Sequence, residues 1–278
     1  GYHDAYASGV IHAVAGGFAL GVLVVLGPRI GKFASDGTPR NIGPRNPWLV
    51  VIGLFLIYTG FWGFYAACNV PIYAAGGDYG GGTTYFTATT IYLTPTTLSG
   101  ITANFLMSLA GGLLMGYWVS KGDPFWTYSS GLAGIITASA GNDLYHPLQA
   151  MIIGAIGVFI MYKMHYWVER RFKIDDAVGA VAVHGYAGVV GLLICGFMLW
   201  GYPSSAYEGY AAISPWGMAI GAVIMFGVLG FLPGWIIALI LNSAGKLRIP
   251  REAELAGLDY NLIEASKRDQ DSYAPAEQ

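Results

Sequence analysis

Long apolar runs recur along the whole chain, and they constrain its fold more than any other feature. Seven runs are long enough to cross a bilayer as helices, which takes about 20 apolar residues each. A segment in lipid must satisfy its own backbone hydrogen bonds, so each run is predicted to be helical. The fourth run is shorter and richer in small residues than the others. The predicted spans are residues 5–27, 47–68, 94–119, 126–142, 147–167, 177–200 and 215–243.

The composition agrees with a protein that lies mostly in lipid. Only 11% of the 278 residues are charged, whereas soluble domains carry about 25%. The 41 glycines suit helices whose backbones approach one another closely. The predicted fold class is therefore an all-α integral membrane protein, a polytopic helical bundle.

The positive charges give this bundle a direction. All 14 Lys and Arg residues fall on one side of the seven predicted spans: 13 follow the first, third, fifth or seventh span, and Lys163 lies near the end of the fifth. Cytoplasmic loops are enriched in Lys and Arg, so we expect this side to be cytoplasmic. The sequence thus predicts a multi-pass protein of the cell membrane (plasma or inner) with its chain start outside. Its predicted parts are a transmembrane domain, 1–245, and a cytoplasmic tail, 246–278.

The sequence contains none of the short motifs typical of hydrolytic, redox or nucleotide-binding sites. The two cysteines, Cys68 and Cys195, make neither a disulfide framework nor a metal motif. A formal net charge of −2 gives no indication of nucleic acid binding. We therefore expect no enzymatic activity, no metal and no cofactor.

One pattern occurs twice: an Asp followed eight residues later by a His. Asp4 precedes His12 in the first span, and Asp176 precedes His184 in the sixth. The two spans are predicted to run in opposite directions, which is the mark of an inverted-topology repeat. Five spans separate the equivalent positions, so the repeat unit is predicted to be five helices long. The first span is then the last helix of a first repeat unit. The four preceding helices of that unit are expected on another chain or on an absent segment. The first residue, Gly rather than Met, agrees with this expectation.

The position of each residue in the pattern suggests its role. An Asp at a helix start can accept hydrogen bonds from free backbone amides, and we favour this structural role over a direct ligand contact. Eight helical residues rise about 12 Å, which places both histidines near the middle of the membrane. Ionisable residues there usually mark a substrate or proton path. For either histidine alone, a satisfied core residue is the competing interpretation.

Five stretches carry a family resemblance, in family order along nearly the whole chain. They are DAYASGVIHAVAGG, GFWGFYAAC, SSGLAGIITASAG, IDDAVGAVAVHGYAGVVG and LRIPREAELAGLD. With them the chain resembles the ammonium transporters of the Amt/Mep/Rh family. The resemblance implies eleven helices, in two inverted five-helix units plus one. This chain would cover helices five to eleven, with the first repeat incomplete.

The resemblance also implies functional roles and partners. Aromatic faces would hold ammonium at an outer vestibule, and ammonia would cross a narrow apolar pore after a proton is given up. The family is typically a homotrimer, and its tail can bind a PII-type regulator. The implied roles are pore proton transfer for His12 and His184, the pore gate for Phe64, the outer substrate site for Cys68, and structural acids for Asp4 and Asp176.

The chain departs from the family pattern at the outer site, where Tyr65 and Cys68 replace the commoner small polar residues. Its tail also lacks the usual residues after GLD. A non-conducting ammonium sensor or an accessory membrane subunit is therefore the leading alternative to a transporter. A channel for another small solute, such as carbon dioxide or methylamine, is the third.

Overall fold

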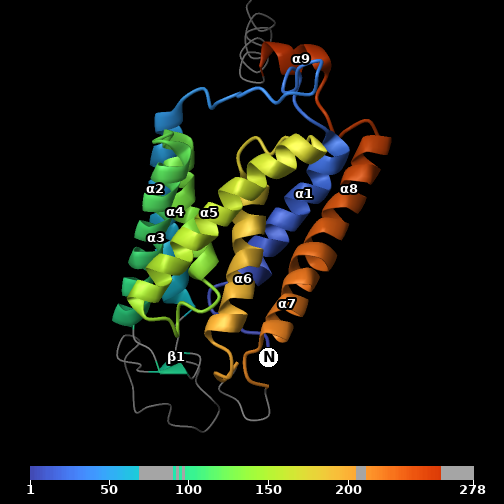
Figure 1. Cartoon of the computed structure of the whole chain (residues 1–278). Coiled ribbons are helices and arrows are strands. Elements are labelled where there is room, and N and C mark those ends of the chain that lie inside the picture. The colour runs from blue at the N-terminus through green and yellow to red at the C-terminus, as the bar shows by residue number, and fades with distance from the viewer. Residues whose placement is uncertain (69–89, 92–93, 96–97, 205–210, 258–278) are drawn as a thin grey trace, which may run out of the picture.

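The structure, a computed structural model, describes residues 1–68, 90–91, 94–95, 98–204 and 211–257. These residues form a bundle of helices (Figure 1). A two-residue antiparallel pair, β1 (Thr90–Ile91) and β2 (Thr94–Pro95), joins them. The helices are η1 (Ser8–Ala13), α1 (Val14–Leu26), α2 (Pro47–Ala67), α3 (Leu98–Ser120), α4 (Pro124–Ala138), α5 (Pro147–Phe172), η2 (Val181–Tyr186), α6 (Ala187–Met198), α7 (Pro215–Val223), η3 (Ile224–Phe231), α8 (Leu232–Ser243) and α9 (Arg251–Ala256).

Four helices begin with the same signal, a proline in the first turn preceded by a polar cap. Proline suits this position because its missing N–H would have no helical partner there. The cap side chain accepts a hydrogen bond from a free amide of the first turn. The caps are Asn46 before α2, Asp123 before α4, His146 before α5 and Ser214 before α7.

Six helical segments of the described chain are long and apolar enough to cross a membrane: Ser8–Leu26, Pro47–Ala67, Leu98–Ser120, Pro147–Phe172, Val181–Met198 and Pro215–Ser243. The fourth predicted span differs from them. Helix α4 has 15 residues, so it rises only about 22 Å. It still runs from one end of the bundle to the other, because α3 and α5 start at the same end (Figure 1). The count of seven crossings stays a prediction.

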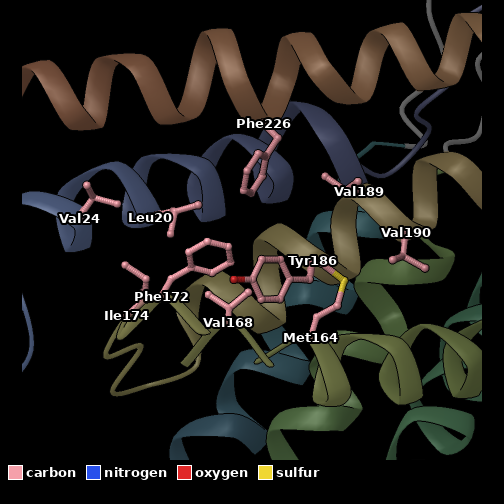
Figure 2. Close-up of a pocket in the computed structure, with 10 residues that line it drawn as sticks. All are labelled: Leu20, Val24, Met164, Val168, Phe172, Ile174, Tyr186, Val189, Val190 and Phe226. Carbon is pink, nitrogen blue, oxygen red and sulfur yellow. The ribbon is translucent and has the colours of Figure 1, made fainter. Parts of the chain in front are cut away.

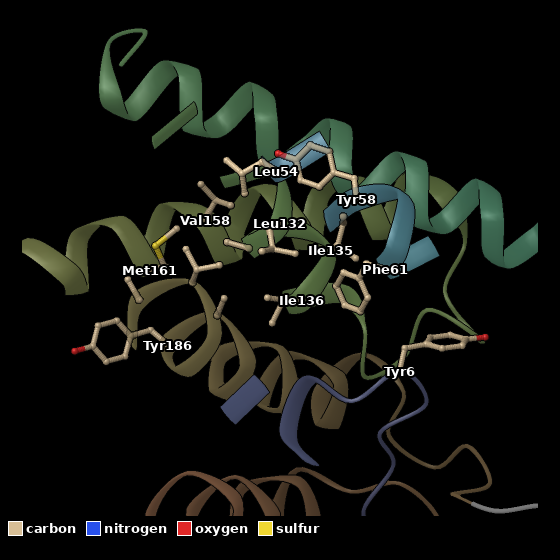
Figure 3. Packing of buried hydrophobic residues seen from close by; sticks show 14 of the residues in the cluster. Tyr6, Leu54, Tyr58, Phe61, Leu132, Ile135, Ile136, Val158, Met161 and Tyr186 are labelled. Carbon is tan, nitrogen blue, oxygen red and sulfur yellow. The ribbon is translucent and has the colours of Figure 1, made fainter. Parts of the chain in front are cut away.

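Helix α4 lies at the centre of the core, which explains its composition. Eleven of its residues are buried, and Leu132, Ile135 and Ile136 meet side chains from α2, α5 and η2 (Figure 3). Small residues let its neighbours approach on every side. A helix surrounded by protein needs no long lipid-facing surface, so the weak hydropathy of this segment reflects its burial.

The loop 27–46, the connection 173–180 and the segment 244–257 meet at one end of the bundle, which we call the basic end (Figure 1). Ion pairs fasten these segments together. Arg29 donates to both carboxylate oxygens of Asp175, at 2.8 and 2.9 Å, and Lys32 Nζ lies 2.5 Å from Glu169. Burial alone would raise the pKa of Asp175, but the hydrogen bonds from Arg29 outweigh it and hold that pKa below its usual range.

Candidate functional site

The two Asp–His repeats, residues 4–17 and 175–191, cross at the middle of the bundle, and we call them the first and second histidine stretches. They run in opposite directions (Figure 1). A Cβ atom on Gly16 would lie 2.1 Å from Gly185 Cα, and one on Gly188 would lie 2.4 Å from Ser8 O. No side chain fits at such distances. Glycine at both positions therefore lets the two backbones touch.

Each histidine stretch begins with a carboxylate that caps its helix. Asp4 Oδ2 accepts hydrogen bonds from the amides of Gly9 and Val10, both at 2.9 Å. Asp176 accepts from the amides of Val181, at 3.2 Å, and Ala182, at 2.9 Å. In both stretches these amides lie five and six residues after the Asp. The two carboxylates thus satisfy equivalent free donors at the two helix starts.

The turn after each carboxylate is also the same. The third residue after the Asp is left-handed in both stretches: Ala7 has a φ of 68°, and Gly179 has a φ of 68°. Glycine adopts this conformation freely, whereas alanine pays about 1–2 kcal/mol for it. The same backbone is therefore built with different residues in the two stretches.

Both histidines lie in π-helical segments, His12 in η1 and His184 in η2. The wider turn shifts side chains relative to an α-helix, and such segments are frequent at functional sites. The His12 amide, for example, donates to Ala7 O five residues back, at 3.2 Å. The sequence offers no sign of this change of helix type.

The two imidazole rings meet edge to edge, nearly in one plane, with their Nδ1 atoms toward each other. Their Nδ1 atoms lie 3.0 Å apart, and the ring centroids are 5.2 Å apart with an interplanar angle of 13°. A hydrogen bond between two Nδ1 atoms needs a proton on one of them and a lone pair on the other. When both rings are neutral, one therefore carries its proton on Nδ1 and the other on Nε2. Such a pair can accept a proton at one Nε2 and release one at the other.

The surroundings of the pair are apolar and aromatic. Phe61 presents its ring to His12 edge to face, with centroids 5.1 Å apart. His12 Nε2 is buried and has no hydrogen-bond partner among the described residues. A small polar molecule entering here would find an unused imidazole nitrogen beside a phenyl ring.

Phe64 and Cys68, the predicted pore gate and outer substrate residue, lie further from His12 than Phe61 does. Phe64 packs on Phe61 and Tyr65, at centroid distances of 5.8 and 6.5 Å. The phenyl ring against His12 is therefore Phe61, one helical turn earlier. Cys68 ends α2 with a free, half-buried thiol, and its amide donates to Phe64 O. The glycine- and tyrosine-rich loop 69–89 that follows lies outside the described residues.

Sequence reasoning missed a tyrosine pair beside these aromatic residues. The rings of Tyr6 and Tyr65 stack, with centroids 4.0 Å apart and an interplanar angle of 13°. The Tyr65 hydroxyl lies 2.6 Å from Ser139 Oγ and accepts from Asn142 Nδ2 at 3.1 Å. The motif GFWGFY contained the signal, since Tyr65 stands where a small residue is common.

At the end of the bundle opposite the basic end, a buried histidine, His3, pairs with the carboxylate of Asp143. His3 Nε2 is 3.1 Å from Asp143 Oδ1, and His3 Nδ1 is 3.3 Å from Ser204 O. Burial alone would lower the pKa of His3. The Asp143 carboxylate outweighs burial, so the pKa of His3 is raised above its ordinary value.

A polar cavity of about 410 Å³ opens at the basic end. Its walls include Asp176, the cap of the second histidine stretch, and His165 from α5. His165 Nδ1 lies 3.6 Å from Asp176 Oδ2. The sequence gives no sign of this contact, because only the folding of the 173–180 connection brings Asp176 close to His165.

Another cavity, of about 370 Å³, is almost entirely apolar. Side chains from α1, α5, η2, α6 and η3 converge on it, with Tyr186 and Phe172 pointing toward each other (Figure 2). It offers nothing for polar chemistry. Within the described residues, no group of three His, Cys, Asp or Glu is placed to hold a metal ion.

Comparisons with known proteins agree on one family. The sequence profile of the Ammonium Transporter Family matches residues 1–268. Ammonium transporter Amt2 of Archaeoglobus fulgidus is 31% identical over 92% of this chain and 53% of its own length. Ammonium transporter Amt2 of Methanocaldococcus jannaschii is 34% identical over 93% of this chain and 55% of its own length. The chain thus spans about half the length of these relatives.

Solved structures extend the comparison to the fold. A structure titled as a sensor Amt protein superposes with a TM-score of 0.73 at 26% identity, over 93% of this chain and 59% of that one. The Rh50 protein of Nitrosomonas europaea superposes with a TM-score of 0.63 at 19% identity, over 98% of this chain and 66% of that one. The latter likeness concerns the fold alone. The prediction of an all-α, multi-pass membrane protein is confirmed, and the chain belongs to the ammonium transporter family.

Proposed function

We propose that this chain contributes to the passage of ammonium or ammonia across a membrane and that the His12–His184 pair is the centre of the path. The observation that carries the proposal is the 3.0 Å contact between the two Nδ1 atoms. Two oppositely directed segments make this contact in the first turns of their helices, His12 in η1 and His184 in η2. Burying two ionisable rings together costs free energy, which a role in transfer explains.

In the proposed mechanism the aromatic side chains around the pair act first. Phenyl and phenol faces attract a cation, and Phe61, Phe64 and Tyr65 cluster on one helix beside His12. Cys68 is the proposed outer substrate residue, and Phe64 the proposed gate. An ammonium ion that loses its proton becomes ammonia, which passes apolar surroundings at a far lower cost. The histidine pair takes part by accepting one proton and releasing another.

The setting of this path is proposed from charge and length. The basic end faces the cytoplasm, because loops there carry the Lys and Arg residues. With α4 counted, the chain crosses the membrane seven times within residues 1–245, and residues 246–278 form a cytoplasmic tail. We further propose that the chain assembles as a homotrimer and that its tail is open to a PII-type regulator. Asp4 and Asp176 serve as structural acids.

Reconstitution of the full chain into liposomes tests the proposal. Labelled methylammonium uptake is expected in wild-type vesicles, with at least a tenfold loss in His12→Ala and His184→Ala. The matched control is His146→Asn, which changes an exposed histidine while keeping a capping acceptor at the start of α5. Equal uptake in wild type and both alanine variants would reject the role of the pair.

A sensor without conduction is the second candidate. Two observations favour it: the likeness to the sensor Amt structure, and the stacked Tyr6 and Tyr65 rings beside the histidines. Calorimetric titration with ammonium chloride, together with the uptake assay, separates the two functions. Saturable heat without uptake by the wild-type chain supports a sensor and contradicts transport. Uptake that His12→Ala abolishes supports transport.

A further inference from the structure

The apolar cavity of about 370 Å³ takes no part in the proposed path. Of the ten side chains that line it, nine end in hydrocarbon or thioether groups, and the tenth is Tyr186. Val24 and Phe172 lie near the ends of α1 and α5 at the basic end, whereas Val190 and Phe226 lie deeper in the bundle. The apolar cavity therefore extends from the basic end toward the middle of the bundle.

The walls and the volume of the apolar cavity limit what can fill it. A polar metabolite would lose its hydration and find almost no hydrogen-bonding group in return. A helix with its side chains is about 10–12 Å across, so even one turn of it needs more room than this. A hydrocarbon chain suits both the walls and the volume. Val24 is 47% exposed and Phe172 is 55% exposed, so such a chain can enter from the surrounding bilayer at the basic end.

The Tyr186 hydroxyl is the one hydroxyl group on the wall of the apolar cavity. The side chain is only 7% exposed, and its phenol points toward Phe172 (Figure 2). Among the described residues, its hydroxyl has no hydrogen-bond partner. A buried hydroxyl without a partner costs free energy, which an acceptor on a ligand would recover. The carbonyl oxygen of a fatty acid ester is an acceptor of this kind.

Helix α5 places a cation at the entrance of the apolar cavity. Met164, Val168 and Phe172 recur every four residues and face the cavity, and Arg171, three residues after Val168, lies beside this stripe. Its guanidinium carbon lies 5.6 Å from the centroid of the Phe172 ring. Within the described part of the chain, Arg171 has no carboxylate partner, unlike Arg29, which is paired at the same end. An anionic group at the entrance would therefore meet an uncompensated positive charge.

We propose that the apolar cavity binds one acyl chain of an anionic phospholipid from the leaflet at the basic end, with the phosphate on Arg171 and an ester carbonyl on the Tyr186 hydroxyl. The cation, the hydroxyl and the apolar walls follow one another in the order in which a phospholipid carries phosphate, ester and hydrocarbon. A guanidinium binds phosphate oxygens well, and basic side chains at a membrane surface favour acidic lipids. The bound lipid contacts α1, α5 and η2, the segment that carries His184.

Photocrosslinking of the full chain in phosphatidylcholine nanodiscs tests this site. A phosphatidylglycerol probe and a phosphatidylcholine probe carry the same diazirine in one acyl chain, and mass spectrometry locates the labelled peptides. The phosphatidylglycerol probe is expected to label residues 164–174 and 186–190 about fivefold more than the phosphatidylcholine probe does. Arg171→Gln removes this preference. The matched control Arg170→Gln removes the same charge one residue away and keeps it.

Two further variants test the chain and the ester separately. Val168→Trp fills the apolar cavity and lowers labelling by both probes, whereas Ile156→Trp, at a position on α5 that is 45% exposed, leaves it unchanged. If Val168→Trp does not fold, Leu20→Trp fills the same cavity from α1. Tyr186→Phe lowers labelling by the ester probes but not by ether-linked probes, which lack the carbonyl.

Three results would overturn the proposal. Equal labelling of the cavity by both probes in the wild-type chain would reject a preference for anionic lipid. Labelling that both cavity-filling variants leave unchanged would reject an acyl chain in the cavity. No labelling of these residues at all would show that protein, from a second copy or another chain, covers the entrance.

Discussion

The first and second histidine stretches share a backbone plan but differ in what surrounds it. Each has a capping Asp, a left-handed residue three positions later, a histidine after eight, and a crossing glycine after twelve. The left-handed residue is Ala7 in one and Gly179 in the other. The carboxylate faces a phenol in one and an imidazole in the other.

This comparison separates two requirements. The shared features set the position of the two imidazole rings, since cap, turn and crossing together fix where each helix begins and how close it comes to its partner. The differing features lie at the two ends of the bundle, where each stretch meets a different aqueous side. The two stretches can therefore keep the same geometry at the histidines while their residues differ at the two ends of the bundle.

The crossing glycines should give the largest effects. Gly16→Val and Gly188→Val place a side chain where the other backbone lies, and each is expected to cost more than about 3 kcal/mol of unfolding free energy. Thermal unfolding and gel filtration in detergent measure this. Gly53→Ala and Gly63→Ala are the controls, since nothing lies within 4 Å of a Cβ there. If one of the two crossing variants folded normally and the other did not, the two histidine stretches would not be equivalent at the crossing.

The capping carboxylates come next. Asp4→Ala and Asp176→Ala each leave two amides without an acceptor, at an expected cost of about 2 kcal/mol in unfolding free energy. The Asn variants should lose about half as much, because an amide oxygen still accepts. Denaturant titration checks the order. A negligible loss in either alanine variant would show that its helix start is held by something else.

The pairing of His3 with Asp143 predicts an effect of pH on stability. The pKa of His3 is raised in the folded protein, so its pairing with Asp143 contributes fully below the unfolded pKa and is lost as pH rises through the folded one. Between about pH 6 and about pH 8 the melting temperature is expected to fall by about 2–4 °C. His3→Gln should remove this slope. At the basic end the sign is opposite, since the lowered pKa of Asp175 makes stability fall in acid.

The left-handed turns should give the smallest effects. Gly179→Ala introduces the strain that Ala7 already bears, and we expect a loss of about 1 kcal/mol. The new Cβ has room, because its nearest neighbour is Trp126 at 3.4 Å. Ala7→Gly relieves strain but loses a buried methyl group, so a change below about 0.5 kcal/mol is expected. Equal losses in both variants would mean that packing, not φ, decides.

Much of the fold followed from the sequence because it depends on periodic or local signals. Apolar length predicted a bundle of membrane-spanning helices, and five matching stretches predicted the family; both predictions are confirmed. The weak fourth span could not be judged in this way. Helix α4 is surrounded by protein. Its composition is therefore set by packing against neighbouring helices, which a hydropathy window does not take into account.

The site was less accessible to sequence reasoning. The Asp–His repeat predicted which histidines face each other across the crossing, but their roles stay a prediction. The choice of Phe64 over Phe61 depends on the rotation of α2 about its axis, which no local signal fixes. His165 becomes relevant only when the chain turns back through 173–180. π-Helical segments have no sequence period of their own, so η1 and η2 were not expected.

The contact between two identical nitrogens has a consequence for repeated turnover. In the proposed relay, a proton that arrives on one far nitrogen and leaves from the other exchanges the roles of donor and acceptor in the middle. The pair then stands in the mirror arrangement and cannot repeat the same step in the same direction. It must first be reset, either by a proton that returns or by rotation of both rings. This recovery step would limit the rate of repeated proton transfer through the pair.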